Sequence, residues 1–250
     1  MLRRLFVSLP FGTLAACAQP AKSGPATAES IMDRYVEVTG GKAARDKVVS
    51  QSVVGRVEIP SQGIKGVLTI YRKKGASYMS MDIPGVGKME NGHSGHVAWE
   101  RSAMMGPRLK EGDEQAQSLR EAALDIESNW RNYFTATLAG EEQAAGEACY
   151  KLILTPKTGA KETRFYSKAS GLLVKASAIQ KSPMGEIPVD TMPSDYREVD
   201  GVKMPFKLTV VVGPQQMSMI QETVVNNAPI PADKLALPAD IKALTSSAPK

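Results

Sequence analysis

The two histidines are the first residues whose spacing could support chemistry. His93 and His96 are flanked by Glu90 and Glu100, so four side chains in this short segment offer metal-ligating atoms. A closed zinc site needs about four ligands held by a structured surround, whereas these histidines flank a glycine-containing turn and do not share a helical face. Ser94 between them lacks the G-x-S-x-G spacing of a hydrolase nucleophile. The segment therefore predicts neither a metal centre nor a catalytic site.

Methionine is the more informative residue type. Apart from Met1 and Met32, every methionine falls in the strands and loops between residues 79 and 219. Methionine adapts to irregular apolar partners and recurs on promiscuous binding surfaces, although the same residues could simply fill a β core. Taken as a set, they predict an apolar ligand cavity. We expect its walls to include Met79, Met81, Trp99, Trp130, Phe206 and Leu208.

The N-terminus has the three parts of an export signal. Arg3 and Arg4 supply the basic region, residues 5–14 are mainly apolar, and small residues follow up to Cys17. This stretch is too short to span a bilayer as a stable helix. We therefore interpret residues 1–16 as a cleaved signal peptide.

Cys17 ends the tetrapeptide Leu14-Ala15-Ala16-Cys17, which resembles the lipobox of bacterial lipoproteins. That resemblance implies cleavage before Cys17 and attachment of several acyl chains, which anchor stably where a single chain binds only marginally. The alternative is an ordinary signal peptide cut near Ala16 or Ala18. By the sorting rule of such lipoproteins, Ala18 in place of aspartate implies the outer membrane.

Residues 17–27 combine this anchor with a flexible tether, because Pro20, Pro25 and small residues dominate them. The protein is thus expected in the bacterial cell envelope, lipid-anchored and facing the periplasm. Acylation of Cys17 would leave Cys149 as a lone thiol, which we expect to be buried rather than reactive.

The charge of the chain gives no sign of a nucleic-acid partner. Its 250 residues are 42% hydrophobic and 23% charged, which is typical of a soluble globular protein. The net charge is +5, and loss of Arg3 and Arg4 leaves 29 basic and 26 acidic residues, or +3. This small, evenly spread excess lacks the basic patch that nucleic-acid binding needs.

The remaining chain reads mainly as β-strands. In Val202–Val212 apolar side chains alternate with polar ones, and Asp200-Gly201 before it is a strong hairpin signal. Apolar residues at helical spacing predict helices at Ala28–Val38 and Asp113–Tyr133. With about eleven strands, this pattern predicts an α+β fold with one strongly curved antiparallel sheet and helices against one face.

Two segments between strands are interpreted as connections. Asn91–Gly95 is expected to be a turn, and Ser102–Gly112 is expected to be a loop. We assign residues 28–240 to a single domain and residues 241–250 to a disordered tail.

Four segments carry a family resemblance: residues 35–41 (YVEVTGG), 97–100 (VAWE), 162–175 (ETRFYSKASGLLVK) and 194–206 (SDYREVDGVKMPF). In this order they resemble bacterial outer-membrane lipoprotein-sorting proteins of the LolA/LolB-like superfamily. The resemblance implies an open half-barrel with helices in its concave side. It also implies that lipid or acyl chains bind in that cavity, with neither catalysis nor a cofactor.

These inferences converge on a non-enzymatic envelope protein that binds acyl chains, lipoproteins or another amphiphile, in lipoprotein sorting or lipid handling. A shuttling carrier must be soluble in the periplasm, so the anchor implied by Cys17 favours an acceptor or accessory binder. The alternative that stays open is an interaction or stress-sensing module of the same fold that uses its surface instead of a cavity.

Overall fold

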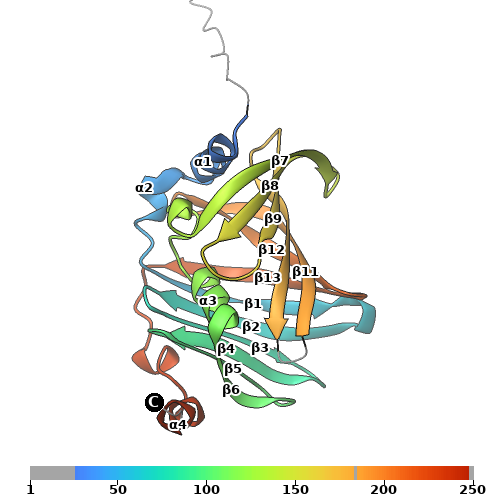
Figure 1. Cartoon of the computed structure of the whole chain (residues 1–250). Coiled ribbons are helices and arrows are strands. Elements are labelled where there is room, and N and C mark those ends of the chain that lie inside the picture. Colours follow the sequence, from blue (N-terminus) through green and yellow to red (C-terminus); the bar gives the residue numbers. More distant parts are fainter. Residues whose placement is uncertain (1–25, 183–184, 248–250) are drawn as a thin grey trace, which may run out of the picture.

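The computed structural model describes residues 26–182 and 185–247 (Figure 1). The signal peptide, Cys17 and the tether up to residue 25 lie outside the described residues. Within the described ranges, thirteen strands form one antiparallel sheet in the order β6-β5-β4-β3-β2-β1-β13-β12-β11-β10-β9-β8-β7. The strands are β1 (Ser50–Ile59), β2 (Ile64–Lys73), β3 (Ala76–Ile83), β4 (Gly87–Ser94), β5 (Val97–Ser102), β6 (Gly106–Lys110), β7 (Phe134–Ala144), β8 (Glu147–Pro156), β9 (Glu162–Ser167), β10 (Leu173–Ser182), β11 (Gly185–Val199), β12 (Val202–Val212) and β13 (Gln215–Asn226).

The helices are short and lie around this sheet. They are α1 (Ala28–Val38), α2 (Gly41–Arg45), α3 (Gly112–Glu121) and α4 (Ala239–Ser247), with 3₁₀ turns η1 (Pro60–Gln62), η2 (Trp130–Asn132) and η3 (Ala232–Lys234). None of the helices in the described part of the chain is long and apolar enough to cross a membrane.

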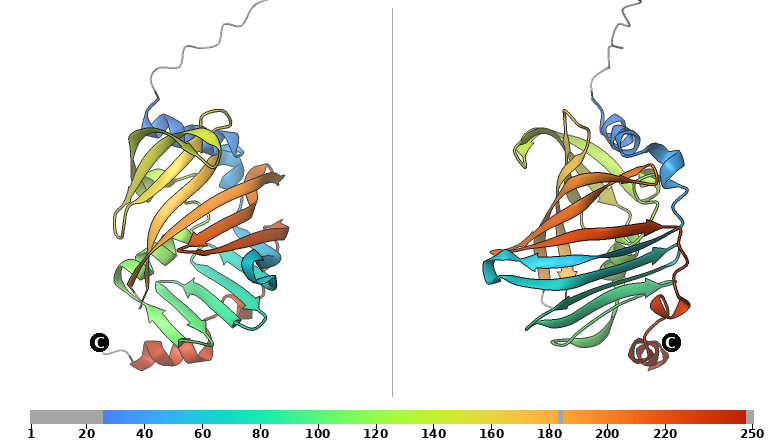
Figure 2. Two further views of the ribbon diagram at one scale, coloured as in Figure 1. Left: turned by 90° about the vertical axis from the view of Figure 1, so that its right-hand side faces the viewer. Right: turned by 180° about the vertical axis from the view of Figure 1, so that it is seen from behind.

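Two meanders make up the sheet. Strands β1–β6 and β7–β13 each follow sequence order, and antiparallel pairing of β1 with β13 joins them. The sheet curves strongly and stays open, with β6 and β7 as its edges (Figure 2). Helix α3 lies inside the curve, beside β4, β5 and β10. The predicted α+β class and single open antiparallel sheet are confirmed, with thirteen strands in the described residues in place of about eleven.

The segment around Gly92 differs from the prediction. Residues 91–94 continue β4 and the turn falls at Gly95, while β6 occupies part of the segment expected to be a loop. A Cβ atom on Gly92 would lie 2.3 Å from the Ser77 carbonyl oxygen and 3.2 Å from Trp99 Cζ2. Gly92 is therefore needed for close approach inside the sheet and not for a turn.

The second helical region is shorter than expected. The apolar stripe predicted one helix over Asp113–Tyr133, but α3 ends at Glu121, and turns lead from there to η2. The Asp125 carboxylate accepts hydrogen bonds from Asn129 Nδ2 at 3.0 Å and from the Tyr133 hydroxyl at 2.5 Å. Aspartate side chains that bond to nearby groups stabilise turns at the expense of the helix.

Helix α1 begins at a capping box. The Ser30 amide donates to Thr27 Oγ1 at 3.2 Å and the Thr27 amide donates to Ser30 Oγ at 2.9 Å, so two otherwise unpaired donors are satisfied. The buried face of α1 shares one apolar cluster with residues of η2 and β7–β9. The buried members of this cluster are Ala28, Ile31, Met32, Tyr35, Val36, Trp130, Phe134, Leu152, Leu154 and Tyr166.

The C-terminal segment forms α4, where the sequence predicted a disordered tail from residue 241. Ile241 is fully buried, and Asp240 forms an ion pair with Arg101 of β5 at 3.2 Å. Arg101 also pairs with the buried Glu90. Burial opposes ionisation of Glu90, but hydrogen bonds from Arg101 and two neighbouring side chains outweigh it and lower the pKa of Glu90 to about 2. Apolar burial and this ionic contact order the segment against the edge of the sheet.

Replacement of Gly92 by alanine tests the close packing of β3, β4 and β5. The added methyl group must displace backbone, so we expect Gly92→Ala to lower the free energy of unfolding by about 1–3 kcal/mol, measured by urea denaturation. Gly95→Asn is the matched control, because Gly95 has open space around it and a φ of +59°, which asparagine tolerates. Equal stability of Gly92→Ala and the native protein would contradict this role.

Candidate functional site

A cavity of about 460 Å³ lies between α3 and the inner face of the sheet. Its walls come from both meanders, with β2–β6 on one side, β10–β13 on the other and α3 as the third wall. Most of the lining side chains from β2, β3 and β11–β13 are apolar. They are Ile70, Met79, Met81, Ile187, Val189, Val210, Val212, Met217 and Met219.

Cross-strand register explains why these methionines gather. Met79 pairs with Ile70, and Met81 pairs with Leu68, across β2 and β3. Successive side chains of a strand point to opposite faces, so all four residues share the inner face. Met79 and Met81 are only half-buried, which leaves part of their thioether side chains facing the cavity.

One end of the cavity is polar. Arg72, Ser77 and His93 form one cross-strand row on β2, β3 and β4, and all three line the cavity. Helix α3 adds Gln117 and Glu121, and Gln117 Nε2 donates a hydrogen bond to Glu121 Oε1 at 2.9 Å. Burial lowers the pKa of the His93 imidazole and so favours the neutral ring. The cavity thus has an apolar part and a polar end.

Ion pairs hold α3 against β5 and β6. Arg108 forms an ion pair with Glu100 at 2.7 Å and another with Glu114 of α3. Lys110 lies 3.4 Å from Glu100 and donates a hydrogen bond to Ser118 at 3.1 Å. The hydrogen bonds that Arg108 donates to Glu114 and Glu100 raise its pKa against the opposing effect of burial. These charges satisfy one another and position the helix over the cavity.

Among the expected cavity residues, Met79 and Met81 lie on the inner face of the sheet and line the cavity. Trp99 also contributes to the cavity wall. However, Trp99 pairs with Gly92, and Gly92 pairs with Tyr78, which alternates with Met79 along β3. The Trp99 ring therefore points to the opposite face of the sheet, where it lies 6.3 Å from the Tyr78 ring.

The other three expected residues do not line the cavity. Trp130 is buried in the cluster with α1, and its indole nitrogen donates to Asp33 at 3.1 Å. Phe206 is buried beneath the guanidinium of Arg197, which lies 4.7 Å from its ring centre. Leu208 is half-buried and pairs with the cavity residue Met219 without itself lining the cavity.

The histidines and cysteines have separate environments. His93 faces the cavity, and its Nδ1 lies 3.3 Å from the carbonyl oxygen of Gly95. In residues 26–182 and 185–247, no group of three His, Cys, Asp or Glu side chains is placed to hold a metal ion. Cys149 is a buried free thiol, and burial raises its pKa. Cys17 lies outside the described residues.

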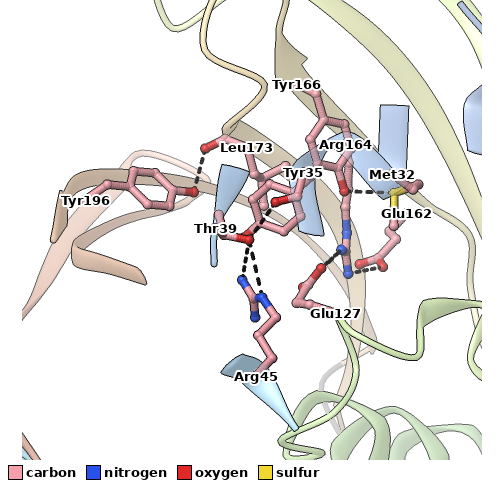
Figure 3. Close-up of polar contacts among 10 residues, drawn as sticks. All are labelled: Met32, Tyr35, Thr39, Arg45, Glu127, Glu162, Arg164, Tyr166, Leu173 and Tyr196. Carbon is pink, nitrogen blue, oxygen red and sulfur yellow. Dashed lines mark hydrogen bonds and ion pairs between the residues drawn. The ribbon is translucent and has the colours of Figure 1, made fainter. Parts of the chain in front are cut away.

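A polar network occupies the opposite end of the half-barrel (Figure 3). Arg164 of β9 is buried and forms ion pairs with Glu127 at 3.2 Å and Glu162 at 2.9 Å. Burial disfavours the charge, but the two carboxylates outweigh it and keep the pKa of Arg164 well above its usual range. This charged triad ties the segment after α3 to the sheet.

The same network fixes α1 and α2. The Tyr166 hydroxyl donates to Met32 Sδ at 3.1 Å, as Figure 3 shows. Thr39 Oγ1 donates to the Tyr35 carbonyl oxygen at 2.5 Å and accepts from Arg45 Nη2 at 2.7 Å. Burial raises the pKa of Tyr35 to about 12. These contacts pack α1 and α2 at this end of the fold, whereas the cavity lies near α3.

Sequence reasoning missed the polar end of the cavity. Leu68, Ile70 and Arg72 alternate along β2, so Arg72 continues the inward-facing positions of the two apolar residues. That alternation was the available signal for Arg72. Glu121 carried no such signal, because its place depends on where α3 ends and how it lies against the sheet.

Comparison with known proteins gives a result at the level of the fold. No family model and no curated protein matches the sequence. A solved structure of a LolA superfamily protein from Nitrosomonas europaea superposes with a TM-score of 0.55, covering 85% of this chain and 99% of that chain at 14% identity. The chain has a LolA-like fold.

Two further solved structures share the architecture. A putative outer membrane lipoprotein-sorting protein domain from Vibrio parahaemolyticus has a TM-score of 0.50 and 11% identity, with 86% of this chain and 98% of that chain covered. A DUF1329 family protein from Desulfovibrio piger has a TM-score of 0.52 and 16% identity, with 82% and 95% covered. The resemblance to lipoprotein-sorting proteins that the sequence motifs predicted is thus confirmed in the fold.

Removal of the Arg164 guanidinium tests the polar network. Arg164→Met leaves Glu127 and Glu162 close together without their cation, so we expect the free energy of unfolding to fall by about 3 kcal/mol in urea denaturation. Arg56→Met is the matched control, because Arg56 pairs with Glu58 and Glu222 at an exposed position. That variant should change stability much less than Arg164→Met, because exposed ion pairs contribute little. Equal effects of the two variants would show that the network has no special role.

Proposed function

We propose that this protein binds the apolar chain of a lipid-like molecule in the cavity beneath α3, without catalysis. One observation carries the proposal: methionine and branched aliphatic side chains from both meanders line this 460 Å³ cavity. Pockets that hold small apolar ligands are concave and mainly apolar, with few polar groups to orient the ligand. The strands supply an apolar wall of this kind, and α3 supplies polar side chains opposite it.

The energy of such binding comes from burial of methylene groups. Each buried CH₂ contributes about 0.8 kcal/mol, so roughly ten of them contribute about 8 kcal/mol. This corresponds to an affinity on the order of micromolar before the cost of association is counted. A preformed cavity keeps that cost small, because the protein need not order new segments around the ligand.

The cellular role that we propose is lipoprotein sorting or lipid handling at the bacterial envelope. Two observations support it. The fold is shared with a structure described as a putative outer membrane lipoprotein-sorting protein domain, and the N-terminal sequence contains the Leu-Ala-Ala-Cys tetrapeptide. Lipid on Cys17 would hold the domain at the membrane through the tether, and Ala18 favours the outer membrane. An anchored domain suits an acceptor or accessory binder, since it cannot shuttle.

Narrowing of the cavity tests the binding function. Met217 lines the cavity and is half-buried, so the indole of Met217→Trp should occupy ligand volume. We expect the affinity for an apolar fluorescent probe such as N-phenyl-1-naphthylamine to fall at least tenfold in a fluorescence titration. Met104→Trp is the matched control, because Met104 is 88% exposed and outside the cavity. Failure of the native protein to bind the probe would contradict the proposal.

Replacement of Cys17 by serine tests the anchor. A serine hydroxyl cannot accept the thioether-linked lipid, so Cys17→Ser should move the protein from the membrane fraction to the soluble fraction. Fractionation of cells followed by immunoblotting measures this. Cys149→Ser serves as the control, since Cys149 is buried within the domain. If Cys17→Ser remains with the membrane, the lipobox interpretation is wrong.

A further inference from the structure

The Arg72 side chain differs from the other arginines of the described chain. Those other arginines all donate to a carboxylate, a carbonyl or a hydroxyl oxygen. Arg72 lines the cavity and is half-buried, yet within the described residues its guanidinium makes no hydrogen bond or ion pair. A guanidinium offers five donors in a planar fork that fits a carboxylate or a phosphate.

The surroundings of Arg72 leave its charge incompletely compensated. Loss of water around the guanidinium lowers the pKa of Arg72, and the negative charge of Glu121 offsets this only in part. The other charged groups of this end are occupied, because Arg108 and Lys110 already pair with Glu100. A half-buried cation without a close partner has lost part of its hydration, so an incoming anion would be favoured here.

The polar groups beside Arg72 are suited to a small oxyanion. Ser77 lies opposite Arg72 on β3, and His93 lies opposite Ser77 on β4. The Ser77 hydroxyl can donate one hydrogen bond to an anionic oxygen, whereas the single N–H of a neutral His93 ring faces the Gly95 carbonyl oxygen. All three residues line the same cavity.

The apolar part of the cavity begins directly beside this polar row. Ile70 and Met79 form the inner-face pair adjacent to Arg72, and Leu68 and Met81 form the next pair. The four residue steps from Arg72 to Leu68 span roughly 13 Å along β2. A molecule with its head at Arg72 would therefore extend its chain along the methionine-lined wall.

We propose that Arg72 binds the anionic head of a single-chain amphiphile, a carboxylate or a phosphate monoester, whose chain lies in the apolar part of the cavity. The proposal rests on the proposed function and adds the chemical class of the ligand. Glu121 lines the same cavity. Its negative charge repels the anionic head and therefore weakens anion binding.

The test compares dodecanoate, dodecyl phosphate and dodecanol by isothermal titration on the full chain carrying Cys17→Ser, so that no attached lipid competes. We expect both anions to bind more tightly than dodecanol. Arg72→Gln should weaken dodecanoate binding at least tenfold while changing dodecanol binding less than twofold. The tighter of the two anions identifies the carboxylate or the phosphate as the preferred head.

A second variant guards against a general loss of structure. Glu121→Gln removes the competing carboxylate, so it should strengthen dodecanoate binding about threefold, a gain that misfolding cannot produce. Equal binding of dodecanoate and dodecanol, with Arg72→Gln weakening both alike, would overturn the role of Arg72 and leave the apolar cavity standing. Absence of binding by all three ligands would overturn both proposals.

Discussion

The pairing of β1 with β13 is the contact on which the rest of the structure depends. Every other strand pair in the described sheet joins neighbours in sequence, whereas this one joins Gln51 to Asn226 and Glu58 to Ser218. Because the cavity walls come from both meanders, the cavity exists only when this pair has formed. Bringing such distant segments together carries the entropic cost of closing a long loop. The packing inside the curve must offset that cost.

The inside of the curved sheet is packed differently at its two ends. At the β7 end, the apolar side of α1 packs against η2 and β7–β9, and Arg164 joins Glu127 to the sheet. Near α3, the methionines on the inner face are only half-buried, and part of the apolar surface stays available. One sheet thus carries a packed region beside α1 and a cavity beside α3.

Local patterns predicted the class of fold because they reflect local physics. Alternation in Val202–Val212 requires a strand with one apolar face, and β12 has the same bounds. Local patterns could not assign the role of Gly92, because a glycine that makes room for Trp99 looks the same in sequence as a turn glycine. The misplaced turn hid the register that directs the Trp99 ring away from Met79. Pairing of β1 with β13 leaves no local pattern at all.

The central claim is that the cavity holds one apolar chain, and native mass spectrometry of the protein released from its own envelope tests it most directly. The prediction is a bound species with the mass of one single-chain amphiphile per protein, present in the native protein and lost in Met217→Trp, whose indole occupies part of the cavity. Protein that is released without any bound amphiphile, and that takes none up when lipid is supplied, would contradict the claim.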